Sequence, residues 1–147
     1  MKQILACVDF SPTTPGILAQ TKRMASARGA DVVVLHVAPG EPDWVGYGPG
    51  PQSVRDQFAL ELREAHAKAQ ALADELRAAG IEAKALSVQG PAPEKILEQA
   101  DALGAELIVI GSRGHSVVYD LLVGSVAQGV LRGSKVPVLV VPVPPET

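Results

Sequence analysis

Short apolar runs alternate along the chain with longer segments in which apolar residues recur every three or four positions. This alternation is typical of βαβ units and predicts a parallel sheet with crossover helices. The apolar runs predict strands at residues 3–8, 32–37, 81–88, 107–110 and 136–141. The periodic segments predict four helices. The first begins near Thr14 and ends at Gly29, and the others cover residues 54–79, 94–103 and 126–132.

The expected helix ends rest on local chemistry. Thr14 is predicted to cap the first helix, with Pro15 at the first helical position, where a missing N–H costs nothing. Gly29 and Gly80 are expected to stop the first two helices. Gly129 is unfavourable inside a short helix, by about 1 kcal/mol relative to alanine. Close packing against a neighbouring segment is one explanation for it.

Size and composition favour a single α/β domain over residues 1–147. Hydrophobic residues make up 47% of the chain and aromatic residues only 3%, so the core must be aliphatic. Aliphatic cores suit parallel strands that helices cover on both faces. The segment from 39 to 53 is rich in Gly and Pro and shows no periodicity, which predicts a loop.

Charge and apolar run lengths exclude several classes of function. The formal charge of −3 argues against a nucleic-acid binder, which needs a basic face. No apolar run approaches the roughly 20 residues of a membrane span, so no membrane partner is expected. One cysteine allows no internal disulfide, and the chain enters its first strand almost at once. We therefore expect no signal peptide and a cytoplasmic location.

A glycine-rich segment is the strongest chemical signal. Gly111-Ser-Arg-Gly114 follows an apolar strand, and nine residues later Gly124-Ser125 opens a helix. A helix N-terminus offers unsatisfied N–H groups and a favourable dipole to phosphate. Glycine permits positive φ and close approach of a ligand to the backbone. Arg113 and His115 add polar donors, while the alternative is that the segment is only a turn.

The spacing of these glycines resembles the ATP-binding signature of the universal stress protein family. Other segments resemble the family in the same order along the chain, namely 4–11, 34–37, 90–96 and 137–142. The resemblance implies a Rossmann-like, open, parallel five-stranded sheet of order 3-2-1-4-5 with helices on both faces. In such sheets ligands bind at the switch point beyond the carboxyl ends of the strands.

The resemblance also implies which residues contact ATP, bound with or without Mg²⁺. Cys7 and Val37 would contact adenine through their main chains, although simple core packing also explains both residues. Asp9 would accept hydrogen bonds from ribose or adenine or hold a metal through water, or it only satisfies nearby N–H groups. The remaining expected contacts, on the glycine segment, are Gly111, Ser112, Arg113, Gly114, His115, Gly124, Ser125 and Val126.

Several features argue against catalysis and metal binding. The chain has no G-x-x-x-x-G-K-[ST] segment, so it lacks the lysine that reaches the terminal phosphates in common ATPases. Its histidines show no metal-ligand spacing, and no catalytic residue is assigned. Asp120, inside the glycine segment, departs from the family pattern and would repel phosphate, and so weaken nucleotide affinity, unless Mg²⁺ or solvent separates the two. Residues 46–50 lack phosphate-loop spacing, and the loop from 40 to 53 is predicted to be a lid.

These observations predict an ATP-binding protein of the stress response with little or no catalytic activity. A slow Mg²⁺-dependent ATPase that uses Asp9 is one alternative. A dimeric interaction module of the same fold, without nucleotide, is another. The apolar segment from 137 to 142 is last in the sheet order, so it should be an exposed edge. The resemblance implies that this edge pairs with its twofold mate in a homodimer.

Overall fold

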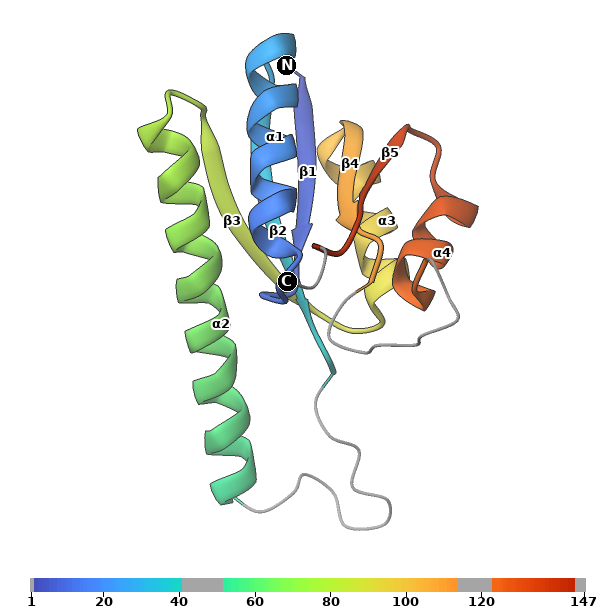
Figure 1. Cartoon of the computed structure of the whole chain (residues 1–147). Coiled ribbons are helices and arrows are strands. Elements are labelled where there is room, and N and C mark those ends of the chain that lie inside the picture. Colours follow the sequence, from blue (N-terminus) through green and yellow to red (C-terminus); the bar gives the residue numbers. More distant parts are fainter. Residues whose placement is uncertain (1, 41–51, 114–122, 145–147) are drawn as a thin grey trace.

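The computed structural model describes residues 2–40, 52–113 and 123–144. Strands and helices alternate strictly in these ranges (Figure 1). The elements are β1 (Gln3–Val8), α1 (Thr14–Arg28), β2 (Asp31–Ala38), α2 (Gln52–Ala78), β3 (Ala83–Gln89), α3 (Ala92–Leu103), β4 (Ala105–Gly111), α4 (Ser125–Gly133) and β5 (Val138–Val141).

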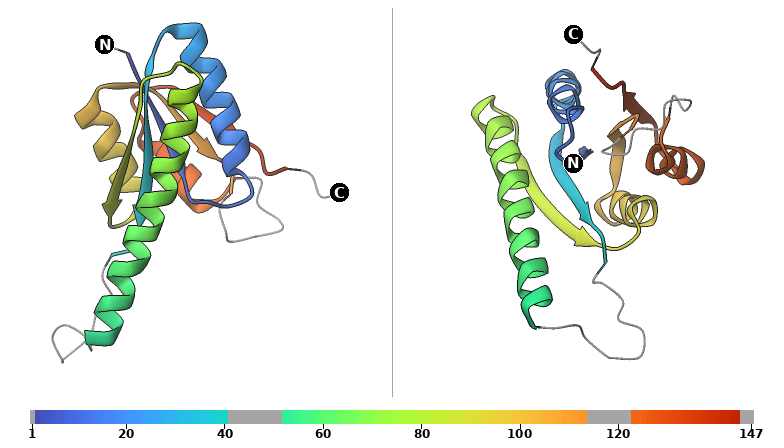
Figure 2. Two further views of the ribbon diagram at one scale, coloured as in Figure 1. Left: turned by 90° about the vertical axis from the view of Figure 1, so that its left-hand side faces the viewer. Right: turned by 60° about the horizontal axis from the view of Figure 1, so that its bottom comes forward.

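The five strands form one parallel sheet of order β3-β2-β1-β4-β5, which confirms the predicted topology. Helices α1 and α2 cover one face, and α3 and α4 cover the other (Figure 2). The chain therefore leaves β1 toward β2 on one side and later returns to β4 on the other. This reversal creates the switch point at the carboxyl ends of β1 and β4.

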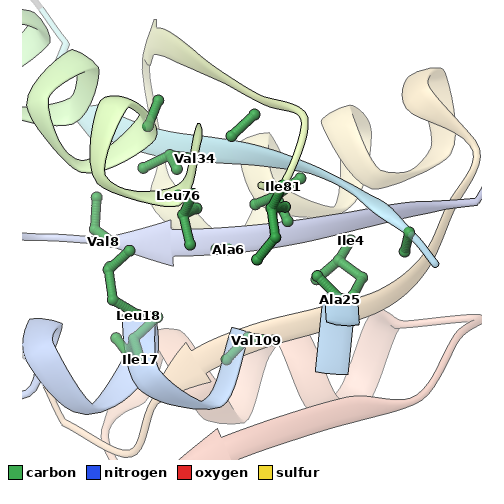
Figure 3. Packing of buried hydrophobic residues seen from close by; sticks show 14 of the residues in the cluster. Ile4, Ala6, Val8, Ile17, Leu18, Ala25, Val34, Leu76, Ile81 and Val109 are labelled. Atoms are coloured by element: carbon green, nitrogen blue, oxygen red, sulfur yellow. The ribbon is translucent and has the colours of Figure 1, made fainter. Parts of the chain in front are cut away.

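Strand residues alternate between two apolar cores, as the period of two in a strand requires. The α1/α2 core is packed tightly beneath those two helices (Figure 3). Its members include Ile4, Ala6, Val8, Ile17, Val34, Leu76 and Val109. The α3/α4 core holds the side chains of the opposite face, including Leu5, Cys7, Leu35, Ile96, Ile108, Ile110, Ala127 and Val130.

The first helix begins one residue earlier than predicted. Thr13 is the N-cap, Thr14 the first helical residue and Pro15 the second. Backbone bonds cause the shift, because the Thr14 N–H donates to the Ser11 carbonyl and the Ile17 N–H to the Thr13 carbonyl. The prediction that the Thr14 hydroxyl caps the helix was wrong, because Thr14 lies inside the helix. The actual N-cap residue, Thr13, makes no side-chain capping bond. At the other end, Gly29 adopts φ 63° and closes the helix as predicted.

Two strands are shorter at their start than the apolar pattern predicted. The Ile81 N–H donates to the Leu76 carbonyl, so Ile81 completes the end of α2 and strand pairing begins at Ala83. Val136 is held in a turn, because its N–H and its carbonyl both bond to the Ser134 hydroxyl group. The apolar pattern correctly predicts that Ile81 is buried and Val136 partly buried. The hydrogen bonds of their backbone groups nevertheless keep both residues out of the strands.

Gly129 allows α4 to approach α3 closely. A Cβ atom at this position would lie 2.8 Å from Cβ and 2.9 Å from Cγ of Pro93, far inside normal contact distance. Close packing was one explanation offered by the sequence, and the structure supports it. The contact fixes where α4 begins relative to the first turn of α3. Among the described helices, none combines the length and the apolar character needed to cross a bilayer.

Candidate functional site

A cavity of about 310 Å³ opens at the switch point, between the carboxyl ends of β1 and β4. We call it the switch-point cavity. Its walls come from β1, β2 and β4 and from the first turns of α1, α3 and α4. The lining residues are Cys7, Val8, Asp9, Ile17, Leu35, Val37, Ala92, Ile96, Ile110, Gly111, Ser112, Arg113, Gly124, Ser125, Val126 and Ala127. This volume lies within the range of small-molecule sites.

One half of the cavity is apolar. Leu35, Ile96 and Ile110 extend the α3/α4 core up to the opening. Cys7 lies among them, and burial raises the pKa of its thiol to about 12. The thiolate is the reactive form of cysteine, so this side chain behaves as an inert apolar group near neutral pH. The apolar half is suited to a flat, uncharged group such as a nucleobase.

The other half of the cavity lies at the start of α4. Ser125 and Val126 line it, and the N-cap residue Gly124 provides no side-chain bond to the first turn. The first intrahelical bond runs from the Gln128 N–H to the Gly124 carbonyl. The N–H groups that precede Gln128 are therefore left without partners inside the helix. Together with the helix dipole, they make this end of the cavity suitable for an anion.

The two glycines that frame this end act through close approach and not through positive φ. Gly124 has φ −72°, and Gly111 is not among the glycines with positive φ, so neither of these two positions uses the positive φ that glycine permits. A Cβ atom on Gly111 would lie 3.0 Å from Thr13 Cγ2. A Cβ atom on Gly124 would lie 3.3 Å from the Ser112 carbonyl oxygen, which accepts the Gly124 N–H. A side chain at either position would push the wall of the cavity.

Asp9 lies at the carboxyl end of β1 and lines the cavity. Its Oδ1 accepts the Ser11 N–H at 3.0 Å, so the carboxylate does satisfy a nearby backbone group. The local role that the sequence left open is therefore present. It does not exclude the second role, because a carboxylate offers two oxygens and several lone pairs. Asp9 is half-buried, as a ligand-contacting group at a cavity wall would be.

Arg113 is half-buried and follows Ser112 directly at the cavity wall. Its Cγ atom would lie 3.7 Å from a Cβ on Gly124, so its stem packs beside the start of α4. The cavity therefore combines one cation, one carboxylate and unpartnered helix N–H groups with an apolar slot. Within the described ranges, no three His, Cys, Asp or Glu side chains gather closely enough to hold a metal ion.

The structure brings nine of the eleven residues expected from the sequence into this one cavity. They come from four different elements or their ends, namely β1, β2, β4 and α4. The other two, Gly114 and His115, lie outside the described residues, as do Asp120 and segment 46–50, which was predicted to belong to the lid. Gly40 and the predicted start of α2 are described, so only part of the expected lid can be placed.

Seven further lining residues, all apolar, were not among the contact residues assigned from the sequence. They are Val8, Ile17, Leu35, Ala92, Ile96, Ile110 and Ala127. The apolar pattern predicts most of them as core residues. The neighbouring sequence does not distinguish a core residue packed on all sides from one that borders a cavity. Ala92 and Ile96 did carry a signal, because they lie in the 90–96 segment that resembles the family.

Comparison with known proteins gives a consistent result over nearly the whole chain. Residues 1–142 match the model of the universal stress protein family. A universal stress protein of Thermus aquaticus is 33% identical across 95% of this chain and 98% of its own length. One from Methanocaldococcus jannaschii is 31% identical across 95% of this chain and 94% of its own length.

Solved structures agree with the sequence comparison. The structure of the M. jannaschii protein superposes with a TM-score of 0.86 at 29% identity and covers 99% of this chain and 98% of that one. A universal stress protein of Archaeoglobus fulgidus, solved in complex with dAMP, has a TM-score of 0.67 at 26% identity. It covers 96% of this chain and 97% of that one.

Proposed function

Since this chain belongs to the universal stress protein family, we propose that it binds ATP in the switch-point cavity and acts as a nucleotide-dependent regulatory protein of the stress response. The observation that carries the proposal is the division of the cavity into an apolar slot and an uncapped helix start. That division matches the two ends of a nucleotide. The dAMP bound by the A. fulgidus relative is also an adenine nucleotide.

In the proposed complex the base occupies the slot beside Leu35, Val37 and Ile96. The phosphates lie against the N–H groups of Ser125 and Val126, where glycine at position 124 leaves room for them. Arg113 contributes a charged donor to the phosphates. Asp9 accepts from the ribose or the adenine amino group, and Mg²⁺, if it accompanies ATP, neutralises phosphate charge.

The proposed activity is binding with little hydrolysis. Fast phosphoryl transfer needs groups that stabilise charge on the transferring phosphate, and a P-loop lysine is absent from the sequence. A protein that holds ATP without hydrolysing it is suited to regulation, in which other proteins recognise the ATP-bound state. The proposed setting is a reducing cytoplasm, which is compatible with a chain whose one cysteine is buried.

The test is calorimetric titration of ATP and, separately, of adenosine into the unaltered chain and into Gly124→Val. The added side chain is expected to displace the Ser112 wall and obstruct the phosphates, so ATP affinity falls about tenfold or more. Adenosine lacks phosphates and should bind both proteins equally. Unchanged ATP affinity, or equal losses for ATP and adenosine, contradicts the proposed orientation. No ATP binding by the unaltered chain contradicts the proposed function.

We also propose a homodimer through β5. This strand ends the sheet, and within the described residues it pairs only with β4. The carbonyls of Pro137 and Val141 accept hydrogen bonds from β4. Because backbone direction alternates along a strand, the N–H groups of Val138 and Val140 point to the other side, where a second chain can accept them.

Leu139 packs against the α1/α2 core, so replacing it would test stability and not the interface. Sedimentation equilibrium at micromolar concentration is the primary measurement, and a dimer is the expected species. Amide hydrogen exchange adds residue-level information, because the Val138 and Val140 N–H groups should be protected at high protein concentration and exchange faster on dilution. A monomer at all concentrations contradicts the β5 dimer.

A further inference from the structure

Phe10 has an unusual backbone conformation beside the cavity. Its φ is 62°, and it is the only non-glycine residue with positive φ in the described part of the chain. Left-handed backbone is unfavourable for a bulky side chain because Cβ crowds the neighbouring carbonyl. Such conformations persist where surrounding contacts hold them, and they cluster at functional sites. Phe10 directly follows Asp9, which lines the switch-point cavity.

The ring of Phe10 is held by side chains from two other elements. The His36 ring on β2 lies against it, with 4.9 Å between the ring centroids and 37° between the planes. The Lys68 ammonium group on α2 lies 5.6 Å from the Phe10 ring centroid, within the range of a cation–π contact. Phe10 also packs against the α1/α2 core. These contacts define what we call the Phe10 stack: Phe10, His36 and Lys68.

The Nδ1 side of the His36 ring is held by packing and not by a hydrogen bond. That nitrogen is buried and has no hydrogen-bond partner among the described residues. A buried polar atom without a partner is uncommon and carries a free-energy cost. The contact that the structure gives the imidazole is the one with the Phe10 ring. The side chain at position 36 therefore serves as a surface for the phenyl ring.

Asp9 and Phe10 direct their side chains to different surroundings. Asp9 lines the cavity and bonds to the Ser11 N–H, whereas Phe10 packs into the α1/α2 core. The hydrogen bond from the Ser11 N–H to Asp9 Oδ1 spans Phe10, so the left-handed backbone of Phe10 is what brings the Ser11 N–H to the carboxylate. Whatever holds the Phe10 ring therefore also sets the position of the Asp9 carboxylate.

We propose that Phe10, held in its left-handed conformation by His36, is a positioning residue for the Asp9 carboxylate in the nucleotide cavity. The inference rests on the proposed function, because Asp9 acts on nucleotide only if nucleotide binds there. It adds a specific dependence: a ring that lines no part of the cavity controls affinity through its neighbour. Without the ring, the turn relaxes out of the left-handed region and the carboxylate moves away from the bound nucleotide.

A double-mutant cycle for ATP affinity tests this dependence. The proteins are the unaltered chain, Asp9→Ala, Phe10→Ala and the double variant, all titrated with ATP at a temperature where each is folded by circular dichroism. Each single change is expected to weaken binding about tenfold. The double variant should bind like Asp9→Ala alone, because Phe10 acts through a carboxylate that is no longer there. Multiplicative losses in the double variant overturn the inference.

Conservative variants separate positioning from general damage. Phe10→Tyr and His36→Phe keep two stacked rings and should keep the ATP affinity of the unaltered chain. Phe10→Gly accepts positive φ without strain but lacks the ring, and it should lose affinity as Phe10→Ala does. Retained affinity in Phe10→Gly overturns the role of the ring. Phe58→Ala is the matched control, because Phe58 is the other phenylalanine, lies on α2 and is absent from the cavity lining.

The outcomes also separate this inference from the proposed function. If the unaltered chain binds ATP and the cycle is multiplicative, the positioning role is wrong and the proposed function stands. If the unaltered chain binds no ATP, the proposed function is wrong and the inference falls with it. Equal losses in Phe58→Ala and Phe10→Ala would assign the effect to general destabilisation and overturn the inference.

Discussion

Both faces of the sheet are apolar, yet the cavity at the carboxyl ends of the strands is bordered mainly by the α3/α4 face. The α1/α2 core is closed along most of β1, with Ile4 and Ala6 buried beneath helices (Figure 3), and only Val8 and Ile17 of this core reach the cavity. On the opposite face, Cys7 and Leu35 continue an equally apolar surface but border the switch-point cavity. Apolar character alone therefore does not decide which face becomes a binding site.

The covering helices account for the difference. Helices α1 and α2 have 15 and 27 residues, whereas α3 and α4 have 12 and 9. Figure 1 shows α2 running the full height of the sheet and beyond it. The shorter pair meets in a close contact at Gly129 and Pro93, which draws α4 toward α3 and leaves the ends of β1 and β4 uncovered. The cavity opens here where helical cover ends.

The largest expected effect compares one large aliphatic side chain from each face. Leu76→Ala, in the closed α1/α2 core, should lower the free energy of unfolding by about 3 kcal/mol and leave ATP affinity unchanged. Ile96→Ala, at the cavity, should cost less, about 2 kcal/mol, because one side of Ile96 already faces a void. It should also weaken ATP binding. Urea denaturation and calorimetry measure the two quantities.

The opposite pattern would break the comparison between faces. If Leu76→Ala changes ATP affinity, the closed face is energetically part of the site. If Ile96→Ala destabilises as much as Leu76→Ala and leaves ATP affinity unchanged, the cavity is not where nucleotide binds.

An intermediate effect is expected from closing the contact between α3 and α4. Gly129→Ala adds a Cβ atom against the rigid Pro93 ring, and the overpacking should outweigh the gain in helix propensity, for a net loss of about 1 kcal/mol. Gly133→Ala is the matched control in the same helix. Its Cβ would meet Cδ1 of Leu97 at 2.5 Å, but that atom is the end of a flexible side chain that can move away.

Urea denaturation of both glycine variants sharpens the comparison, because only a rigid contact can hold α4 in place. Gly129→Ala should be less stable than the unaltered chain, and Gly133→Ala should be close to it. Equal stability of Gly129→Ala and the unaltered chain would mean that α4 is free to shift. The glycine contact would then not explain the open end of the cavity.

The smallest expected effect is a pH dependence confined to the closed face. Burial lowers the pKa of His36 from its ordinary value of 6.5, Asp9 opposes that shift, and Lys68 adds to it. The unfolded chain therefore binds a proton at a pH where folded His36 does not, so stability falls as pH drops below 6.5 and levels off below the folded pKa.

The change in unfolding free energy should stay below about 1 kcal/mol, because solvent screens a half-exposed ring. His36→Phe should remove this part of the pH dependence, as measured by urea denaturation between pH 5 and 8, a range set by the ordinary titration of histidine. An unaltered slope in His36→Phe would assign the acid sensitivity to other groups.

Much of the candidate site could be predicted from the sequence because its signals are local. Asp9 ends an apolar run, and Gly111 and Gly124 bracket a strand–helix junction at a recognisable spacing. Their neighbours in the chain identify them without knowledge of any contact. The parallel sheet was predicted from the alternation of apolar runs with segments of helical periodicity, and the strand order was implied by the family resemblance. Both are confirmed.

What could not be predicted depends on contacts between segments far apart in the chain. Ile17 and Ile96 look like ordinary core residues until α1 and α3 are placed beside the cavity. Backbone bonding moved the helix cap from Thr14 to Thr13 and excluded Val136 from β5. Hydrophobicity records whether a side chain is buried, and it carries no information about which hydrogen bonds the backbone will make.

The sequence by itself determined the class of fold, the two apolar faces of each strand and the position of the strand–helix junction where we propose that phosphate binds, because period, glycine spacing and apolar runs are properties of neighbouring residues. Only the tertiary structure decided that Phe10 is held left-handed against His36, 26 residues away, and that Gly129 packs on Pro93. These features arise where different elements meet, and the free energy of such contacts exists only once the chain has folded.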